Sequence, residues 1–241
     1  MEQSYINCLK KLRKFRKRIQ KESDLKIGKL YFSWIATKTE KILNEKNKDY
    51  IYENLVKYTL ENYKIDKYTY ERLNKKEKQI VNDNYIEKNN YYVFENRNIS
   101  KSEVMYILKN ILLKRGNVVW IDFGFNIGNE FGGMHPAIIL KNFDTELLVL
   151  PVSSKKPKEY IKLEQKYIDG NITFQEYMNR KTAITDIVQL DRIYRFKNMT
   201  RWANITRIRK VSILRLNFED TIGKIDGKYL NIISKKISIE F

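Results

Sequence analysis

The chain changes character at Arg115-Gly116-Asn117-Val118-Val119-Trp120-Ile121-Asp122-Phe123. Of the nine glycines in the sequence only Gly28 precedes residue 116, and all three prolines follow it. Glycine and proline punctuate turns, so the turn-forming residues are concentrated in the second half of the chain. We therefore predict a boundary near residue 115 between two parts of different architecture.

After Gly116 the sequence contains short runs of apolar and β-branched residues. These runs span residues 118–123, 137–140, 147–152, 184–190 and 205–214. Runs of this length and spacing are typical of strands in a small antiparallel barrel. In the tail, Leu230, Ile233 and Ile237 would share one face of a final helix, although Ile237 and Ile239 suit a strand equally well.

Before the boundary, apolar residues recur at helical spacing in residues 6–19, 51–60 and 104–112. The last of these segments has clear ends. Ser100 and Glu103 have the spacing of a capping box, and Gly116 follows the basic pair Lys114 and Arg115. We therefore predict an all-helical N-terminal domain of unknown role over residues 1–114 and a β-barrel domain over residues 115–241.

The net charge is +18, from 47 Lys and Arg against 29 Asp and Glu. A field of this size points to a polyanionic partner such as nucleic acid. The coding bias of an AT-rich genome is an alternative source of the lysines, but it does not explain the deficit of acids.

The cysteine count and the hydropathy of the sequence indicate the cellular compartment. Cys8 is the only cysteine, so we expect no intramolecular disulfide, no thiolate metal site and a reducing, cytoplasmic environment. No run reaches the apolar length of a membrane span, and the basic start of the chain lacks the apolar core of a signal peptide.

Three later segments extend the pattern of the first strand. They are the loop Gly128-Asn129-Glu130-Phe131-Gly132-Gly133-Met134-His135-Pro136, the strand Leu147-Leu148-Val149-Leu150-Pro151-Val152-Ser153, and the stretch from Ala203 to Leu216. In order and spacing they resemble the MazF/PemK family of type II toxin endoribonucleases, over residues 115–157 and 200–241. The matches contain three departures: Asn117 stands where the family commonly has aspartate, His135 replaces an arginine, and Arg207 replaces a glutamine.

The resemblance implies an α+β fold, with a small antiparallel SH3-like or CcdB-like β-barrel and a C-terminal helix. It also implies cleavage of single-stranded RNA with the ribose 2′-hydroxyl as nucleophile, without a metal or other cofactor. A homodimer with the RNA in its interface groove and a cognate antitoxin are the partners that the resemblance implies.

His135 and Ser153 are the catalytic residues we predict. His135 is the only histidine, and its ordinary pKa near 6.5 lets it take or give a proton at neutral pH. Ser153 occupies the family's hydroxyl position and would donate to the phosphate. Further residues predicted to bind phosphate or shape the site are Ser154, Lys155, Arg207, Arg209, Glu130, Gly132 and Gly133.

Two alternatives remain open from the sequence. A histidine before a proline is often only a turn residue, and Ser153 to Pro157 also reads as an exposed hairpin. The protein would then be a non-catalytic RNA-binding module, or an inhibitor that binds a protein target as CcdB-like gyrase poisons do.

Overall fold

The computed structural model describes residues 64–95, 99–124, 132–143, 146–217 and 222–240, and the isolated positions Lys10, Ser33, Ile35 and Ala36. The helices predicted within residues 6–19 and 51–60 lie outside the described residues.

The region of residues 64–113 contains strands as well as helices. Its elements are β1 (Ile65–Asp66), α4 (Lys67–Glu71), α5 (Lys75–Asn84), β2 (Tyr85–Lys88), β3 (Tyr91–Phe94), α6 (Lys101–Ile107) and the π-helical turn η2 (Leu108–Leu112). The strands form an antiparallel sheet in the order β1-β3-β2. The prediction of an all-helical N-terminal domain is therefore wrong for residues 65–94.

The error arises at a two-residue turn. Asn89 and Asn90 have φ angles of +50° and +67° and join β2 to β3. Hairpins favour asparagine here because its short polar side chain tolerates positive φ. Tyr85 pairs with Phe94 across the hairpin, so the aromatic residues on both sides of this turn lie in strands rather than in an all-helical domain.

The predicted capping box of α6 is confirmed. The backbone amide of Glu103 donates to the Ser100 hydroxyl at 3.3 Å, and the Ser100 amide donates to the Glu103 carboxylate at 3.1 Å. The helix runs on through η2 and ends before Gly116, whose φ is +88°.

The second part is an antiparallel sheet with three helices. Its elements are β4 (Asn117–Asp122), β5 (Met134–Asn142), β6 (Glu146–Ser153), α7 (Lys158–Ile168), α8 (Phe174–Thr182), β7 (Ile187–Leu190), β8 (Arg201–Asn204), η3 (Ile205–Arg207), β9 (Arg209–Ser212), η4 (Ile213–Arg215), β10 (Leu216–Asn217), β11 (Gly223–Lys224) and α9 (Gly227–Glu240). The C-terminal helix is confirmed.

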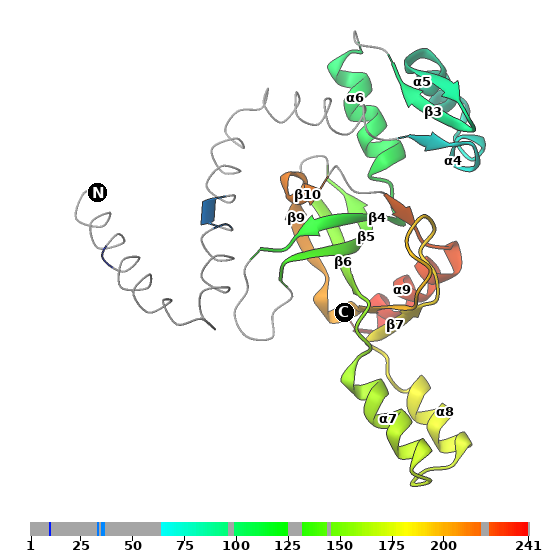
Figure 1. The fold of residues 1–241 in the computed structure, drawn as a ribbon, viewed down its shortest axis with the longest axis vertical. Coiled ribbons are helices and arrows are strands. Elements are labelled where there is room, and N and C mark those ends of the chain that lie inside the picture. Colours follow the sequence, from blue (N-terminus) through cyan, green and yellow to red (C-terminus); the bar gives the residue numbers. More distant parts are fainter. Residues whose placement is uncertain are drawn as a thin grey trace.

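The sheet follows the order β10-β4-β5-β6-β8-β7, with β11 beside β4 and β9 beside β6. It is not a closed barrel, which corrects the prediction. The reason lies in β6, which pairs with β9 up to Val149 and with β8 from Val152 onward. The hairpin of α7 and α8 projects away from the sheet between β6 and β7 (Figure 1).

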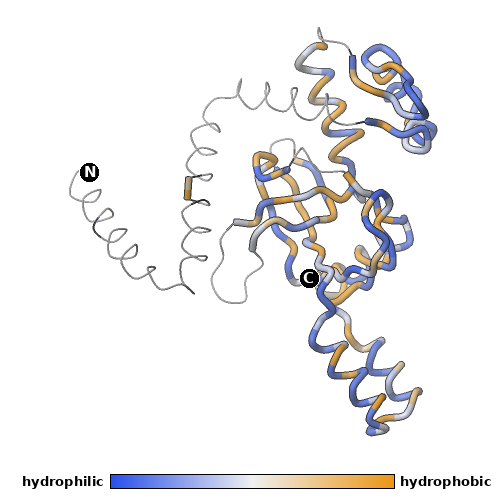
Figure 2. The backbone as a smooth tube through the Cα atoms, in the orientation of Figure 1, coloured by the Kyte–Doolittle hydropathy of each residue, from blue (hydrophilic) through white to orange (hydrophobic). Residues whose placement is uncertain are grey.

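The central strands are buried on both sides. One face packs with α6 and η2 in a core that includes Leu108, Ile111, Leu112, Val119, Ile121, Ala137, Ile139 and Val149. The other face packs against α9 in a core that includes Val118, Ile138, Leu150, Val152, Tyr229 and Ile233. The middle of the molecule is correspondingly hydrophobic, while α7 and α8 alternate polar and apolar residues (Figure 2). The proposed division at residue 115 thus runs through a shared core.

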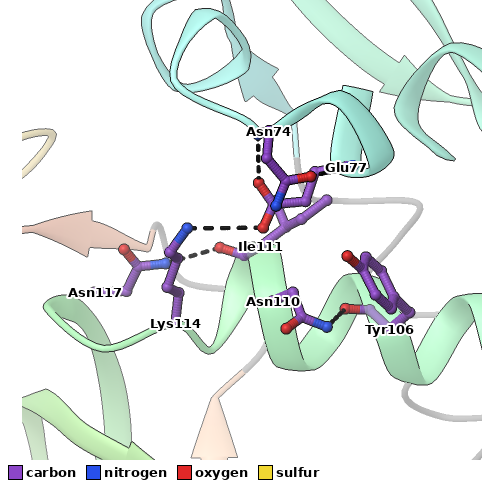
Figure 3. A network of polar contacts seen from close by, with 7 residues as sticks. All are labelled: Asn74, Glu77, Tyr106, Asn110, Ile111, Lys114 and Asn117. Atoms are coloured by element: carbon purple, nitrogen blue, oxygen red, sulfur yellow. Dashed lines mark hydrogen bonds and ion pairs between the residues drawn. The ribbon is translucent and has the colours of Figure 1, made fainter. Parts of the chain in front are cut away.

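Polar contacts join η2 to the first strand (Figure 3). The Asn117 side-chain amide donates to the carbonyls of Ile111 and Leu112, at 3.0 and 2.8 Å. Lys114 lies 3.7 Å from the buried carboxylate of Glu77. An aspartate at position 117 would face those two carbonyls with oxygens and could not donate to them. Asparagine can, so the departure from the family's aspartate is explained by the helical turn that precedes the strand.

Candidate active site

Two adjacent strands carry the predicted catalytic pair. Ala137 of β5 pairs with Pro151 of β6. His135 lies two residues before Ala137, and Ser153 lies two residues beyond Pro151. Because side chains alternate along a strand, His135 and Ser153 point to the same face of the sheet, at the same end of the strand pair.

His135 is half-buried opposite the fully buried Ile121 of β4. Burial lowers its pKa from the ordinary value because it disfavours the charged imidazolium, while a hydrogen bond to the Gly132 backbone acts in the opposite direction. The lowered pKa favours the neutral imidazole, which is the form able to accept a proton.

The loop that leads to His135 is closed by Gly133. Its amide donates to the Gly124 carbonyl at 2.7 Å, and its carbonyl accepts from the Phe123 amide at 2.9 Å. Gly133 has φ of +78°, and an added Cβ would meet nothing within 4 Å. Glycine is thus required here for backbone conformation rather than for space. Gly132 precedes it directly, and Glu130 lies outside the described residues.

An open cleft of about 420 Å³ lies at the end of β6. It brings together three of the predicted phosphate-binding or catalytic residues, Ser153, Lys155 and Arg207. The Ser153 hydroxyl accepts from the Lys155 backbone amide at 3.0 Å. This turn folds the basic residues that follow β6 back toward the serine.

The lining of the cleft is strongly basic. Its cations are Lys155, Lys156, Lys158 and Arg207, and its only acid among the described residues is Glu159. Lys156 is ion-paired with Glu164 of α7. The remaining positive charge suits the backbone of a nucleic acid, because phosphate contacts dominate binding of that kind.

One wall of the cleft is aromatic. Trp202 of β8 pairs with Ser153 across the strands. Its ring lies 4.7 Å from the ring of Tyr160 in α7, and 8% of Trp202 is exposed. The insertion of α7 and α8 therefore holds Trp202 in place beside the predicted hydroxyl donor.

The structure does not gather every predicted residue into the cleft. His135 is not part of its described lining, although it shares a face with Ser153. Ser154 is exposed in the turn after β6. Arg209 lies on β9 opposite Val149 and does not line the cleft either.

The lining residues that sequence reasoning missed include Lys156, Lys158, Trp202 and Asn204. A signal for the lysines was present, since they continue the basic run that begins at Lys155. Trp202 carried no such signal, because its place depends on the pairing of β6 with β8.

Within residues 64–95, 99–124, 132–143, 146–217 and 222–240, no group of three or more His, Cys, Asp and Glu side chains is placed to hold a metal ion. Over the same described part of the chain, no helix combines the length and apolarity needed to cross a membrane.

The family model for PemK-like, MazF-like toxins of type II toxin–antitoxin systems matches residues 114–241. The chain therefore belongs to this toxin family, whose members are generally endoribonucleases, and the recognition from sequence is confirmed. A comparison with curated proteins finds no significant match.

Two solved structures illustrate the similarity. MazF (form I) from Deinococcus radiodurans is 15% identical, with 53% of this chain and 94% of that chain covered and a TM-score of 0.36. The MazE–MazF complex (form II) from the same organism is also 15% identical, with 53% and 93% covered and a TM-score of 0.33.

Proposed function

We propose that this protein is an endoribonuclease that cuts single-stranded RNA without a metal ion, through attack of the ribose 2′-hydroxyl. The observation that carries the proposal is the placement of His135 and Ser153 on one face at the same end of β5 and β6, beside a basic cleft. Family membership supports the same reaction class.

In the proposed reaction His135 takes the proton of the 2′-hydroxyl. The 2′-oxygen forms a bond to phosphorus and the bond from phosphorus to the 5′-oxygen breaks. The products are a 2′,3′-cyclic phosphate and a 5′-hydroxyl, and solvent in the open cleft supplies the proton that the departing oxygen takes up. The lowered pKa of His135 favours this role, because the group is neutral and ready to act as a base.

The negative charge of the phosphate would be balanced by the residues that line the cleft. The Ser153 hydroxyl would donate to a non-bridging oxygen, and Lys155 and Arg207 would hold the phosphates on either side. Fixed donors of this kind stabilise the phosphorane as charge develops on it. Ser154, Arg209, Gly132 and Glu130 are retained as candidates for contacts at the edge of the site.

The RNA partner is proposed on the basic cleft and on family membership. Trp202 lines the cleft beside the phosphate contacts, but its ring is buried against Tyr160, so the preference for single-stranded RNA is proposed on family membership. A homodimer and a cognate antitoxin are proposed on family membership, and a cytoplasmic location is proposed on the single cysteine. We also propose that the chain divides near residue 115 into an N-terminal domain and a toxin domain.

The test incubates the purified full chain in EDTA with a single-stranded RNA and with the DNA of the same sequence. We expect cleavage of the RNA alone, with 2′,3′-cyclic phosphate ends. Ser153→Ala should slow cleavage by about 10²-fold, the typical cost of losing one donor to a developing oxyanion. Ser238→Ala, at an exposed position of α9, is the control and should cleave as the wild type.

Cleavage of DNA, or an absolute need for Mg²⁺, would reject the mechanism. Binding of RNA without cleavage would favour the non-catalytic RNA-binding alternative. Absence of both binding and cleavage would favour a protein target, as for CcdB-like inhibitors.

A further inference from the structure

A second basic site lies where residues 64–117 meet the toxin-like sheet. A small, partly enclosed cavity of about 40 Å³ is lined there by residues from both regions. Four of its lining side chains are cationic, namely Arg72, Lys114, Arg195 and Lys224. These four cations share one small cavity, of which Arg72 and Lys114 are exposed members, and it lies apart from the lining of the cleft at Ser153.

Two of these cations are matched by carboxylates. Arg195 forms an ion pair with Asp66, and Lys114 lies 3.7 Å from Glu77. Asp66 and Glu77 are 8% and 4% exposed, so both are held in place. The other two cations, Arg72 and Lys224, form no ion pair with any acid in the part of the chain that the structure describes.

Lys224 is fixed in the cavity by its backbone. Its amide donates to the Tyr194 carbonyl at 3.3 Å and its carbonyl accepts from the Tyr194 amide at 2.8 Å, while on the other side β11 pairs it with Asn117. The side chain is half-buried. Burial lowers the pKa of Lys224, and the nearby charges of Arg72 and Lys114 lower it further, while the carboxylate of Asp66 acts in the opposite direction. A like-charged, half-buried group of this kind gains from an added anion.

The cavity also shows backbone strain and an aromatic side chain in its lining. Arg195 has φ of +70°, which is costly for a residue other than glycine and is typical of functional positions. Tyr194 lines the cavity, and its ring lies 5.6 Å from that of Tyr68; the two residues are 38% and 44% exposed. The Arg72 guanidinium lies over the Tyr68 ring, 3.8 Å from its centroid.

We propose that this junction cavity binds a phosphate monoester group, with Lys224 and Arg72 as its principal ligands. Its volume of about 40 Å³ suits a single tetrahedral anion better than a length of chain. The group could come from inorganic phosphate or from the end of a nucleotide, for which the exposed ring of Tyr194 provides a surface against which a base can stack. The ligand would link the N-terminal region to the toxin-like sheet.

The test measures thermal unfolding and calorimetric binding of the full chain with inorganic phosphate, against sodium chloride of equal ionic strength. Phosphate should raise the melting temperature beyond the salt control, since a ligand that binds only the folded state stabilises it. Lys224→Met should weaken phosphate binding roughly tenfold or more, as expected for loss of a charged hydrogen-bond donor. Arg72→Gln, at an exposed position, should do the same without disturbing the fold. Lys166→Gln, exposed on α7, should bind as the wild type.

Adenosine 5′-phosphate and adenosine distinguish the source of the phosphate. Tighter binding of the nucleotide than of inorganic phosphate assigns the site to a nucleotide, and equal binding assigns it to the free anion. A phosphate response no larger than that of chloride, or one unchanged in both Lys224→Met and Arg72→Gln, would overturn the proposal. Ser153→Ala should keep the full phosphate response, so this site can be tested whatever the outcome for RNA cleavage.

Discussion

The two basic sites of this protein use the same kind of residue in opposite surroundings. The cleft at Ser153 is open, and its cations Lys155, on the turn that follows β6, and Lys158, at the start of α7, are both exposed. The junction cavity is a tenth of that volume, at about 40 against 420 Å³, and its Lys224 is held between two backbone partners. Open, solvated cations suit a long polyanion, whereas confined cations suit one small anion.

The difference extends to the family relationship. The described lining of the cleft lies wholly within residues 114–241, the range of the family match. The junction cavity needs Thr69, Arg72 and Leu73, which lie outside that range. Its properties therefore belong to this chain's N-terminal region as much as to the toxin-like sheet.

The largest expected effect is at His135. His135→Ala should lower the rate of RNA cleavage by roughly 10²- to 10⁴-fold, the usual contribution of a general base. Single-turnover cleavage of a labelled RNA measures it, and binding of a 2′-O-methyl RNA should change little. The phosphate response of the junction cavity should remain as in the wild type. Cleavage at the wild-type rate would show that His135 is only a turn residue.

The next largest effect is expected at the junction. Asn117→Asp would turn a double donor into a buried acceptor that faces the carbonyls of Ile111 and Leu112. We expect a loss of about 3 kcal/mol in the free energy of unfolding, since a buried charged group would lack its partners. Urea unfolding measures it.

Two variants sharpen that result. Asn117→Ala leaves the two carbonyls without a donor and should cost about 1–2 kcal/mol. Asn231→Asp, exposed on α9, should be close to neutral. If Asn117→Asp were as stable as the wild type, the family's aspartate would be equally suitable at this position. The two hydrogen bonds donated by Asn117 would then not explain why this chain has asparagine there.

Sequence reasoning recovered the toxin-like half better than the N-terminal half. The turns around Gly116 and Gly133 and the strands they connect follow local rules of backbone conformation, so they could be predicted from the residues themselves. The hairpin at Asn89 and Asn90 obeys the same rules, but the prediction of an all-helical N-terminal domain missed it.

Only the part of the site that lies on adjacent strands could be predicted from the sequence. His135 and Ser153 could be brought together because adjacent antiparallel strands and their family positions fix their relative places. Trp202 and the junction cavity could not be predicted. Trp202 depends on the switch of β6 from β9 to β8, and the cavity is lined by residues some 150 positions apart, such as Arg72 and Lys224. Long-range pairing of this kind leaves no trace in local periodicity.

The rate of cleavage should depend on pH in a defined direction. Burial holds the pKa of His135 below its ordinary value, and the proposed base is the neutral form. The rate should therefore be constant from about pH 7 to 8 and fall about tenfold per pH unit only below the lowered pKa. NMR titration of the single histidine gives the same midpoint independently. A rate that fell on going from pH 6 to 7 would mean that the imidazolium is the active form.

The same shift affects stability. The unfolded chain binds a proton to His135 at a higher pH than the folded chain does. Stability should therefore decline as pH falls through about 6.5 and level off below the folded pKa. His135→Gln should remove this part of the pH dependence, as measured by urea unfolding at pH 5, 6 and 7.

The smallest expected effect is at Lys155, and it separates the two sites by their response to salt. In an open cleft one lysine contributes mainly by displacing a counterion from the nucleic acid. Lys155→Gln should therefore lower the slope of log affinity against log salt by about 0.7, the value for one phosphate contact on a single strand. Fluorescence titration with the 2′-O-methyl RNA measures the slope.

Lys166→Gln has the same change of charge on α7, outside the lining of both sites, and should leave the slope unaltered. Phosphate binding at the junction should show no dependence on Lys155. If both lysine variants lowered the slope equally, the RNA would be responding to the net charge of +18 rather than to the cleft. The cleft at Ser153 would then bind RNA no more specifically than any other basic surface of the molecule.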